Sequence, residues 1–327
     1  MQDFDRRQLL RLGAAMMLAG SRAVRAAEPP APPALPVPAN WQRAARLPLW
    51  PGMPPGSGTS APPSTPPGWP ASYVRGVSIP ELRVFEPARP NGRAVLVMPG
   101  GAYWFVSVVN EGADLAPRLA ARGYTVFVLI YRLPGEGWAN RADVPLQDAQ
   151  RAMRLIRSRA AEFRLHPAQV AALGFSAGGH LAATLATRHA ERVYAARDAA
   201  DQLDPRPWAA GLIYPVISLR DPLTHELSRR LLLGDAPTPV QIDRRSAELH
   251  VDATTSPLFL CHAMDDTAVP VENALRMMAA MREAHRPVEA HLLQEGGHAF
   301  GVGRPGTPSA HWIDLLCTWL DRTAQAG

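Results

Sequence analysis

The sequence predicts an α/β fold in which helices cover both faces of a mostly parallel central sheet. Short apolar runs alternate with helix-like segments over about two hundred residues from Tyr73 onward, an alternation that is typical of parallel sheets. A glycine-rich turn that carries Ser176 also stands between one such run and the next helix-like segment. Because ligands of these folds bind beyond the carboxyl ends of the strands, we expect the functional residues to follow strand ends.

Each expected element follows from local composition. Residues 74–79 and 82–85 are expected to be two short strands separated at Pro80. Because proline cannot donate a hydrogen bond to a neighbouring strand, we expect them near a sheet edge. Runs rich in Val, Leu, Ile and Phe predict further strands at 94–98, 124–130, 169–173, 209–217, 257–262 and 288–293. Amphipathic segments predict helices at 113–122, 144–161, 180–189, 227–233, 271–285 and 309–322. Gly123 is expected to end the first helix and Asp143 to cap the second.

The sequence divides into three parts. Residues 1–26 carry paired arginines, a modestly apolar stretch and small or apolar residues before a cut after Ala26, which favours a twin-arginine export signal. Residues 27–72 are rich in proline and are expected to be a linker or N-terminal extension. Residues 73–325 are expected to be the α/β domain, with residues 218–251 as a short cap. We therefore expect an exported protein, periplasmic or secreted, without a stable membrane anchor.

Composition excludes several classes of protein. With 47% hydrophobic and 19% charged residues the chain is globular, and no apolar run reaches the ~18 residues of a membrane-spanning helix. Its basic residues are scattered arginines without lysine, which argues against nucleic-acid binding. Cys261 falls in an expected strand and Cys317 in an expected helix, so we expect two buried free thiols and no metal-like cluster.

Ser176 lies in the pattern Gly174-Phe175-Ser176-Ala177-Gly178. The expected strand before it and helix after it give the context of a nucleophile elbow. The glycines permit the sharp turn and the close approach of neighbouring backbone. We predict that Ser176 is a nucleophile, which then needs a base and a group that orients the base.

Two further strand-end motifs supply these groups. His298 follows the last expected strand, between glycines, and is the predicted general base. Asp266 follows the strand at 257–262 and is the predicted partner of the histidine; the adjacent Asp265 competes, with a capping or pocket role as its alternative. The order serine, aspartate, histidine separates this arrangement from the chymotrypsin and subtilisin orders.

A fourth motif, Pro99-Gly100-Gly101-Ala102, directly follows the strand at 94–98. We expect the backbone amides of Gly101 and Ala102, together with that of Ala177, to form an oxyanion hole. Substrate-pocket candidates nearby are Tyr103, Trp104 and His180. The two aromatic residues either stack on a sugar or acyl group or pack in the interior, and His180 and Glu111 either support the pocket or are polar residues at helix starts.

Taken in order, these four motifs resemble the serine-esterase branch of the α/β-hydrolase superfamily, near hormone-sensitive-lipase-type and exported acetyl-xylan-esterase or feruloyl-esterase-like proteins. Pro99 and Ala102 depart from the His-Gly-Gly-Gly of the lipase type and are similar to the carbohydrate-esterase members. The resemblance implies an α/β-hydrolase fold and hydrolysis of a small-molecule or oligosaccharide ester through an acyl-enzyme. It implies no cofactor and no metal. A general carboxylesterase or lipase-like enzyme, a peptidase-like hydrolase and a non-catalytic carbohydrate-binding relative stay open as alternatives.

Overall fold

The computed structural model describes residues 31–57 and 64–325, and the expected export signal, 1–26, lies outside them. The described residues from Pro33 onward belong to one compact unit. Part of the expected N-terminal extension, 39–48, adds a short helix and a strand to this unit. Among the described residues, no helix is long and apolar enough to cross a membrane.

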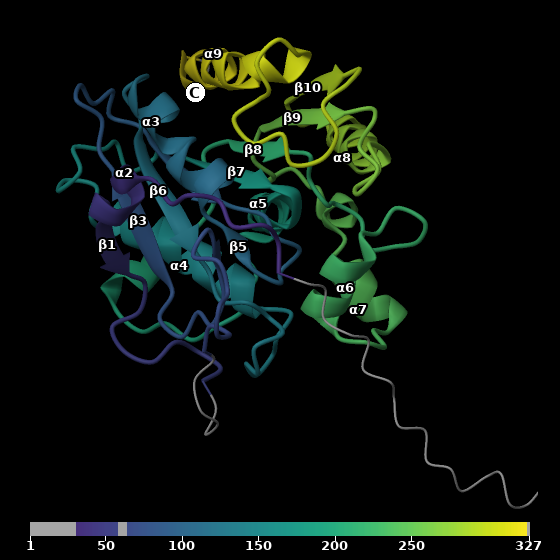
Figure 1. Ribbon diagram of the computed structural model, residues 1–327, viewed down its shortest axis with the longest axis horizontal. Coiled ribbons are helices and arrows are strands. Elements are labelled where there is room, and N and C mark those ends of the chain that lie inside the picture. Colours follow the sequence, from purple (N-terminus) through teal and green to yellow (C-terminus); the bar gives the residue numbers. More distant parts are fainter. Residues whose placement is uncertain (1–30, 58–63, 326–327) are drawn as a thin grey trace, which may run out of the picture. The chain divides into compact units, whose positions relative to one another are not determined.

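Eight strands of the described chain form one sheet in the order β1-β3-β6-β4-β7-β8-β9-β10 (Figure 1). The six strands from β6 to β10 along this order run parallel, whereas β3 pairs antiparallel with both β6 and β1. The strands are β1 (Ala45–Pro48), β3 (Glu81–Phe85), β4 (Ala94–Met98), β6 (Thr125–Ile130), β7 (Val170–Phe175), β8 (Ala210–Ile213), β9 (Leu258–Ala263) and β10 (Val288–Leu293). The expected mostly parallel sheet is thereby confirmed.

Helices surround this sheet (Figure 1). They are α2 (Ala39–Arg43), α3 (Ala116–Ala120), α4 (Val144–Ser158), α5 (Ser176–Arg188), α6 (Glu226–Leu233), α7 (Pro239–Arg244), α8 (Glu272–Glu283) and α9 (Trp312–Gln325). Helix α5 packs on β7 and β8, α3 contacts β6, and α9 contacts β9. Shorter turns are a π-helical turn at Val109–Ala113 and 3₁₀ turns at Ala199–Gln202, Ala247–His250 and Pro308–His311.

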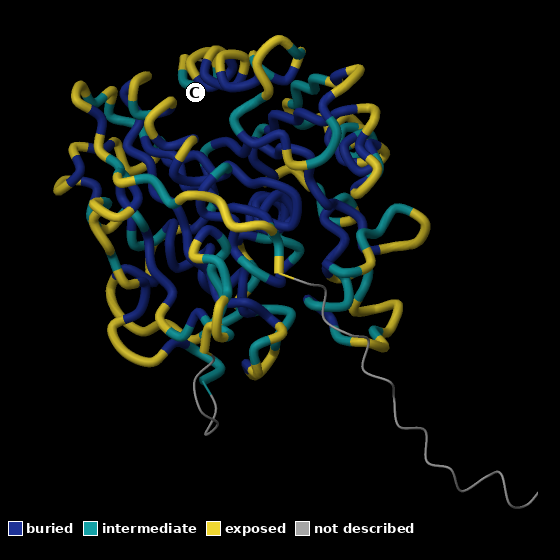
Figure 2. The backbone as a smooth tube through the Cα atoms, in the orientation of Figure 1, coloured by how far each residue is buried: buried dark blue, intermediate teal, exposed yellow. Residues whose placement is uncertain are grey.

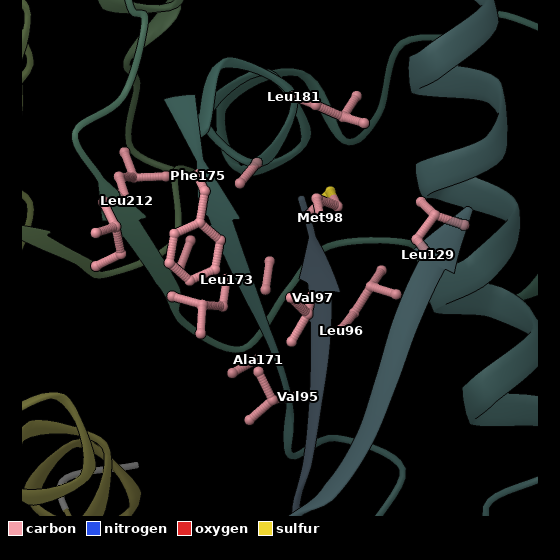
Figure 3. Close-up of a cluster of buried hydrophobic side chains, with 14 of the residues drawn as sticks. Val95, Leu96, Val97, Met98, Leu129, Ala171, Leu173, Phe175, Leu181 and Leu212 are labelled. Atoms are coloured by element: carbon pink, nitrogen blue, oxygen red, sulfur yellow. The ribbon is translucent and has the colours of Figure 1, made fainter. Parts of the chain in front are cut away.

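The centre of the sheet is buried on both faces. Every residue of β4, β6, β7, β8 and β9 is buried, as in a parallel sheet covered by helices on each side. In Figure 3 the side chains of Val97, Met98, Leu173 and Phe175 from the adjacent strands β4 and β7 belong to one apolar cluster with Leu181 of α5. Figure 2 shows the same buried centre beneath exposed loops. Packing of this kind makes the ends of β4 and β7 rigid.

The chain reverses its direction of travel across the sheet at β4. From β4 it passes to β6 on one side, and after α4 it returns to β7 on the other side. Such a switch point leaves a crevice at the carboxyl ends of the two neighbouring strands. The glycine turn at residues 99–102 and the turn at Ser176 both leave from these ends, so the topology brings them together.

Several expected elements differ from the structure. The expected strand at 74–79 is wrong: only Tyr73–Val74 is extended, as β2, and it pairs with β5 (Val106–Ser107) in a separate ribbon. The expected helix at 113–122 is reduced to α3, and a π-helical turn precedes it. The strand expected at 209–217 ends at Ile213. Asp143 makes no capping hydrogen bond but forms an ion pair with Arg245 instead.

Both cysteines are free and buried, as expected. Burial raises the pKa of the Cys261 thiol to about 12 and that of Cys317 to about 11. Since the thiolate is the reactive form, neither residue is a nucleophile at neutral pH.

Candidate active site

Ser176 is the first residue of α5 and directly follows β7, so the expected strand–turn–helix context is present. Its φ of 50° lies in the left-handed region, which a non-glycine residue adopts only when the surroundings hold it there. The two glycines explain how the turn fits. A Cβ on Gly178 would lie 2.0 Å from the carbonyl oxygen of Met98, and one on Gly174 would lie 2.1 Å from that of Gly178.

His298 lies on the loop after β10 and joins Ser176 to Asp266. The Oγ of Ser176 lies 2.9 Å from Nε2 of His298, and Nδ1 of His298 lies 2.7 Å from Oδ2 of Asp266. Because Nδ1 faces a carboxylate it carries the proton, which leaves Nε2 free to accept from the serine hydroxyl. The structure thus brings together all three residues that the motifs singled out, in the geometry of a nucleophile, a base and an orienting acid.

Asp266 is fixed from both sides. Its Oδ1 accepts from the backbone amides of Ala268 and Val269, each at 2.9 Å, while its Oδ2 faces His298 and also Nε2 of His262 at 3.0 Å. Burial opposes the charge on this side chain, but the hydrogen bonds from His262 and His298 outweigh it and hold the pKa of Asp266 well below its usual range. Asp266 is therefore a carboxylate at neutral pH.

Asp265 has a different task from its neighbour. Its Oδ1 accepts from the backbone amide of Gly297 at 2.8 Å, directly before His298. This hydrogen bond and a further one from Gly296 lower the pKa of Asp265. Asp265 therefore ties the histidine loop to the loop after β9, whereas the carboxylate hydrogen-bonded to the imidazole is that of Asp266.

The turn after β4 passes directly beside the nucleophile. A Cβ on Gly100 would lie 2.9 Å from the Cβ of Ser176. Gly101 and Ala102 both have positive φ, 123° and 56°, so the turn is held in an unusual conformation. Among the described residues, no acceptor is hydrogen-bonded to the amides of Gly101, Ala102 or Ala177. Three unused amides near a serine nucleophile are what an oxyanion hole requires.

Tyr103, Trp104 and His180, the three substrate-pocket candidates, are all buried. Tyr103 is only 2% exposed, and its hydroxyl donates to Nδ1 of His180 at 2.8 Å, while Nε2 of His180 donates to the backbone carbonyl of Arg245 at 2.6 Å. Trp104 is buried edge-on against Trp69, with ring centroids 5.1 Å apart. Stacking of Tyr103 or Trp104 on a substrate is therefore wrong, and both pack in the interior.

His180 instead connects the elbow helix to the expected cap, since Arg245 follows α7. Burial lowers the pKa of His180 to about 4, so its imidazole is neutral in the folded protein at neutral pH. The segment 218–251, which was expected to be a short cap, contains the two short helices α6 and α7.

Sequence reasoning missed two histidines. His262 appeared only as the last residue of an expected strand, and nothing in the sequence indicated that it lies beside Asp266. The chain has ten histidines, and His225, just before α6, belongs to no recognisable motif. It is half-buried and hydrogen-bonded through Nδ1 to Ser228, and burial, together with the nearby positive charge of protonated His298, lowers its pKa. The cap thereby contributes a polar ring close to the triad.

In the part of the chain that the structure describes, no group of three or more His, Cys, Asp or Glu side chains is arranged to hold a metal ion. One cavity away from the triad has a volume of about 540 Å³ and lies beside Arg154 and Tyr194. Its lining contains charged, polar and apolar side chains.

The chain is similar to a described protein family and to proteins of known function. The BD-FAE family model matches residues 82–281. An acetylxylan esterase of Xylanibacter ruminicola is 32% identical over 244 residues, which are 73% of this chain and 48% of the relative. The chain thus spans about half the length of that relative.

Two solved structures are also similar. An acetyl ester-xyloside bifunctional hydrolase of Caldicellulosiruptor lactoaceticus has a TM-score of 0.71 at 30% identity, covering 86% of this chain and 97% of its own. An esterase of Thermogutta terrifontis with bound propionate has a TM-score of 0.62 at 26% identity, covering 75% of this chain and 89% of its own.

Proposed function

Because this chain belongs to the BD-FAE family and has the α/β-hydrolase fold that its motifs predicted, we propose that it is a serine esterase that deacetylates acylated carbohydrate. The observation that carries the proposal is the hydrogen-bonded series Ser176–His298–Asp266 at 2.9 and 2.7 Å beside a turn with unused amides. These are the groups that acyl transfer to water needs.

The geometry assigns each residue a step. His298 accepts the hydroxyl proton of Ser176 through Nε2 as the serine oxygen attacks the ester carbonyl. The amides of Gly101, Ala102 and Ala177 hold the negative oxygen of the tetrahedral intermediate. Protonated His298 then gives its proton to the departing alcohol, and the same nitrogen later takes a proton from the water that cleaves the acyl-enzyme. Asp266 stabilises the imidazolium in both halves of the reaction.

The substrate class is supported by the similar proteins. The name of the curated relative refers to acetylxylan, and the name of the solved bifunctional hydrolase refers to acetyl esters and to xylosides. The match with this chain covers 97% of the solved hydrolase. A small cap, with α6 and α7 as its helices, also suits a leaving group as bulky as an oligosaccharide.

The test is release of acetate from acetylated xylo-oligosaccharides. We expect the wild-type protein and the control Ser158→Ala, an exposed serine of α4, to release acetate at equal rates, and Ser176→Ala to release none above background. Acetate release that survives in Ser176→Ala contradicts the proposed nucleophile. Cleavage of an aryl acetate but of no acetylated sugar contradicts the substrate class alone.

A second candidate is a general carboxylesterase that acts on short acyl chains. It is favoured by the similarity to an esterase whose structure holds propionate. Rates on aryl acetate, propionate and butyrate, compared with acetylated xylan, acetylated pectin and a feruloylated sugar, separate the two. A preference for the small aryl esters by more than tenfold in kcat/KM supports the second candidate.

We further propose that the protein acts outside the cytoplasm. The support is the paired arginines and the apolar stretch within residues 1–26, which lie outside the described part of the chain. Replacing Arg6 and Arg7 with lysine is expected to leave the protein in the cytoplasmic fraction. Unchanged export of that variant contradicts the twin-arginine route.

A further inference from the structure

Glu111 is a buried carboxyl group that takes no part in the proposed chemistry. It lies on the π-helical turn that follows β5 and is only 3% exposed. Burying an ionisable group is costly unless hydrogen bonds compensate for the loss of water. The partners of Glu111 therefore indicate what the group does.

One carboxylate oxygen holds the oxyanion turn. Oε2 of Glu111 accepts from the backbone amide of Gly100 at 2.6 Å. Gly100 immediately precedes the proposed donors Gly101 and Ala102. Because the next residues have positive φ, this turn needs support from outside itself.

The other oxygen reaches the histidine loop through Tyr214, which follows β8. Oε1 of Glu111 accepts from the hydroxyl of Tyr214 at 2.9 Å, and that hydroxyl accepts from the backbone amide of Gly301 at 3.1 Å. The Tyr214 ring also stands edge-on to His298 and to Phe300, at centroid distances of 5.0 and 4.5 Å. Tyr214 thus touches the histidine loop at three residues.

The directions of these hydrogen bonds are consistent with one another. Both the Gly100 amide and the Tyr214 hydroxyl donate to Glu111, so both carboxyl oxygens act as acceptors. Burial raises the pKa of Glu111, and the two donated hydrogen bonds and the charge of protonated His298 oppose that rise. The group serves as a double acceptor between two loops that leave different strands.

We propose that Glu111 is a positioning residue which, through Gly100 and Tyr214, fixes the oxyanion turn and the histidine loop relative to each other. This inference rests on the proposed function. The two loops follow β4 and β10, which are four places apart in the sheet, so the backbone alone does not fix their separation. Catalytic groups need placement to within about 0.5 Å, and a misplacement of about 1 Å can cost 100-fold in rate.

The test begins with Glu111→Gln, which keeps the shape but offers one acceptor oxygen instead of two. We expect kcat on an aryl acetate to fall about 10- to 100-fold while KM changes less than about twofold, because the substrate still binds but meets misaligned groups. Tyr214→Phe removes the hydroxyl that joins Glu111 to Gly301, leaves the hydrogen bond from Gly100 in place and is expected to lower kcat in the same way. In the double variant the losses are expected not to add, because both changes interrupt one connection.

The matched control is Glu81→Gln. Glu81 is also a buried carboxylate, but on β3 near the sheet edge, where it pairs with Arg46 and Arg83. Its loss is expected to lower the melting temperature and to leave kcat of the folded protein unchanged. A fall in kcat from Glu111→Gln that the control does not share therefore identifies positioning rather than general destabilisation.

Wild-type kcat in Glu111→Gln, or losses that add fully in the double variant, overturns the inference. If Glu111→Gln does not fold, Tyr214→Phe decides alone, since it retains the carboxylate: lowered kcat at constant KM supports the role, and wild-type kcat overturns it. Different results contradict the esterase function and the role of Glu111. An inactive wild-type protein contradicts the proposed function, whereas an active wild type with an equally active Glu111→Gln overturns only the role of Glu111.

Discussion

His262 lies 3.0 Å through Nε2 from Oδ2 of Asp266, the same oxygen that faces His298. Nε2 of His262 also lies 3.0 Å from the carbonyl oxygen of Val269, and since both neighbours are acceptors, this nitrogen carries a proton and donates. The side chain of Asp266 is therefore restrained at both oxygens before it meets the catalytic imidazole.

Replacing His262 with leucine is expected to lower kcat about 10- to 100-fold, because Asp266 loses a donor and can rotate away from His298. His262→Gln, whose amide nitrogen can reach a similar position, is expected to recover most of the activity. Steady-state kinetics on an aryl acetate measure both. Equal activity of the leucine and wild-type proteins contradicts the restraint.

The two adjacent aspartates are expected to respond differently. Asp266→Asn should lower kcat by about 10⁴, since the amide favours the wrong tautomer of His298. Asp265→Asn keeps one side-chain acceptor oxygen for the backbone amides of Gly296 and Gly297 and should cost far less. Comparable losses in the two variants mean that the loop contact matters as much as the carboxylate beside the imidazole, contrary to the roles assigned here.

Gly178 is expected to tolerate no side chain. A Cβ there would lie 2.0 Å from the carbonyl oxygen of Met98, so Gly178→Ala should lower the free energy of unfolding by about 3 kcal/mol or more. Gly52→Ala is the control, because no atom lies within 4 Å of its added Cβ, and we expect a change within about 0.5 kcal/mol. Urea denaturation gives both values, and near-equal stabilities contradict the close packing of the elbow on β4.

Stability is expected to fall in acid because of His180. Its pKa is about 4 in the folded protein against 6.5 in the unfolded chain, so between these values the unfolded chain binds the extra proton. The sign is therefore a loss of stability as the pH falls from 7 to 4, about 3 kcal/mol from this residue. His180→Gln should show a correspondingly smaller loss over that range when unfolding is followed at each pH. His189, His225 and His250 also have lowered pKa values and leave a residual slope. Identical slopes for the two proteins contradict the assignment.

Local patterns predicted those elements whose cause is local. The apolar runs at β4 and β10 gave the observed bounds, and the turn glycines marked the loops of Ser176 and His298 because sharp turns need them. Strand β1 was missed, since it lies in a proline-rich segment and is extended only because it pairs with β3. The expected strand at 74–79 failed for the converse reason: its composition suits a strand, but only its first residue, Val74, finds a partner on a neighbouring strand.

In the site, too, the residues with a local sequence signal were predicted and those placed by distant contacts were not. The motifs predicted that Ser176, Asp266 and His298 lie close together, because each residue follows a strand end and parallel strands end at one edge of a sheet. The direction of the Tyr103 side chain, by contrast, depends on the positive φ of the turn and on a partner, His180, that lies 77 residues away. The place of His262 beside Asp266 likewise depends on how the loop after β9 folds back, which no spacing in the sequence reveals.

Whether Ser176 is the activated nucleophile is measured by locating a covalent adduct. The folded protein is incubated with a fluorophosphonate, which reacts with activated serines, and is digested and mapped by mass spectrometry. The arrangement at the elbow predicts one adduct on Ser176, its complete loss in Ser176→Ala, and strongly slowed labelling in His298→Ala. A folded wild-type protein that stays unlabelled, or that carries the adduct on another residue, would show that Ser176 is not the activated nucleophile.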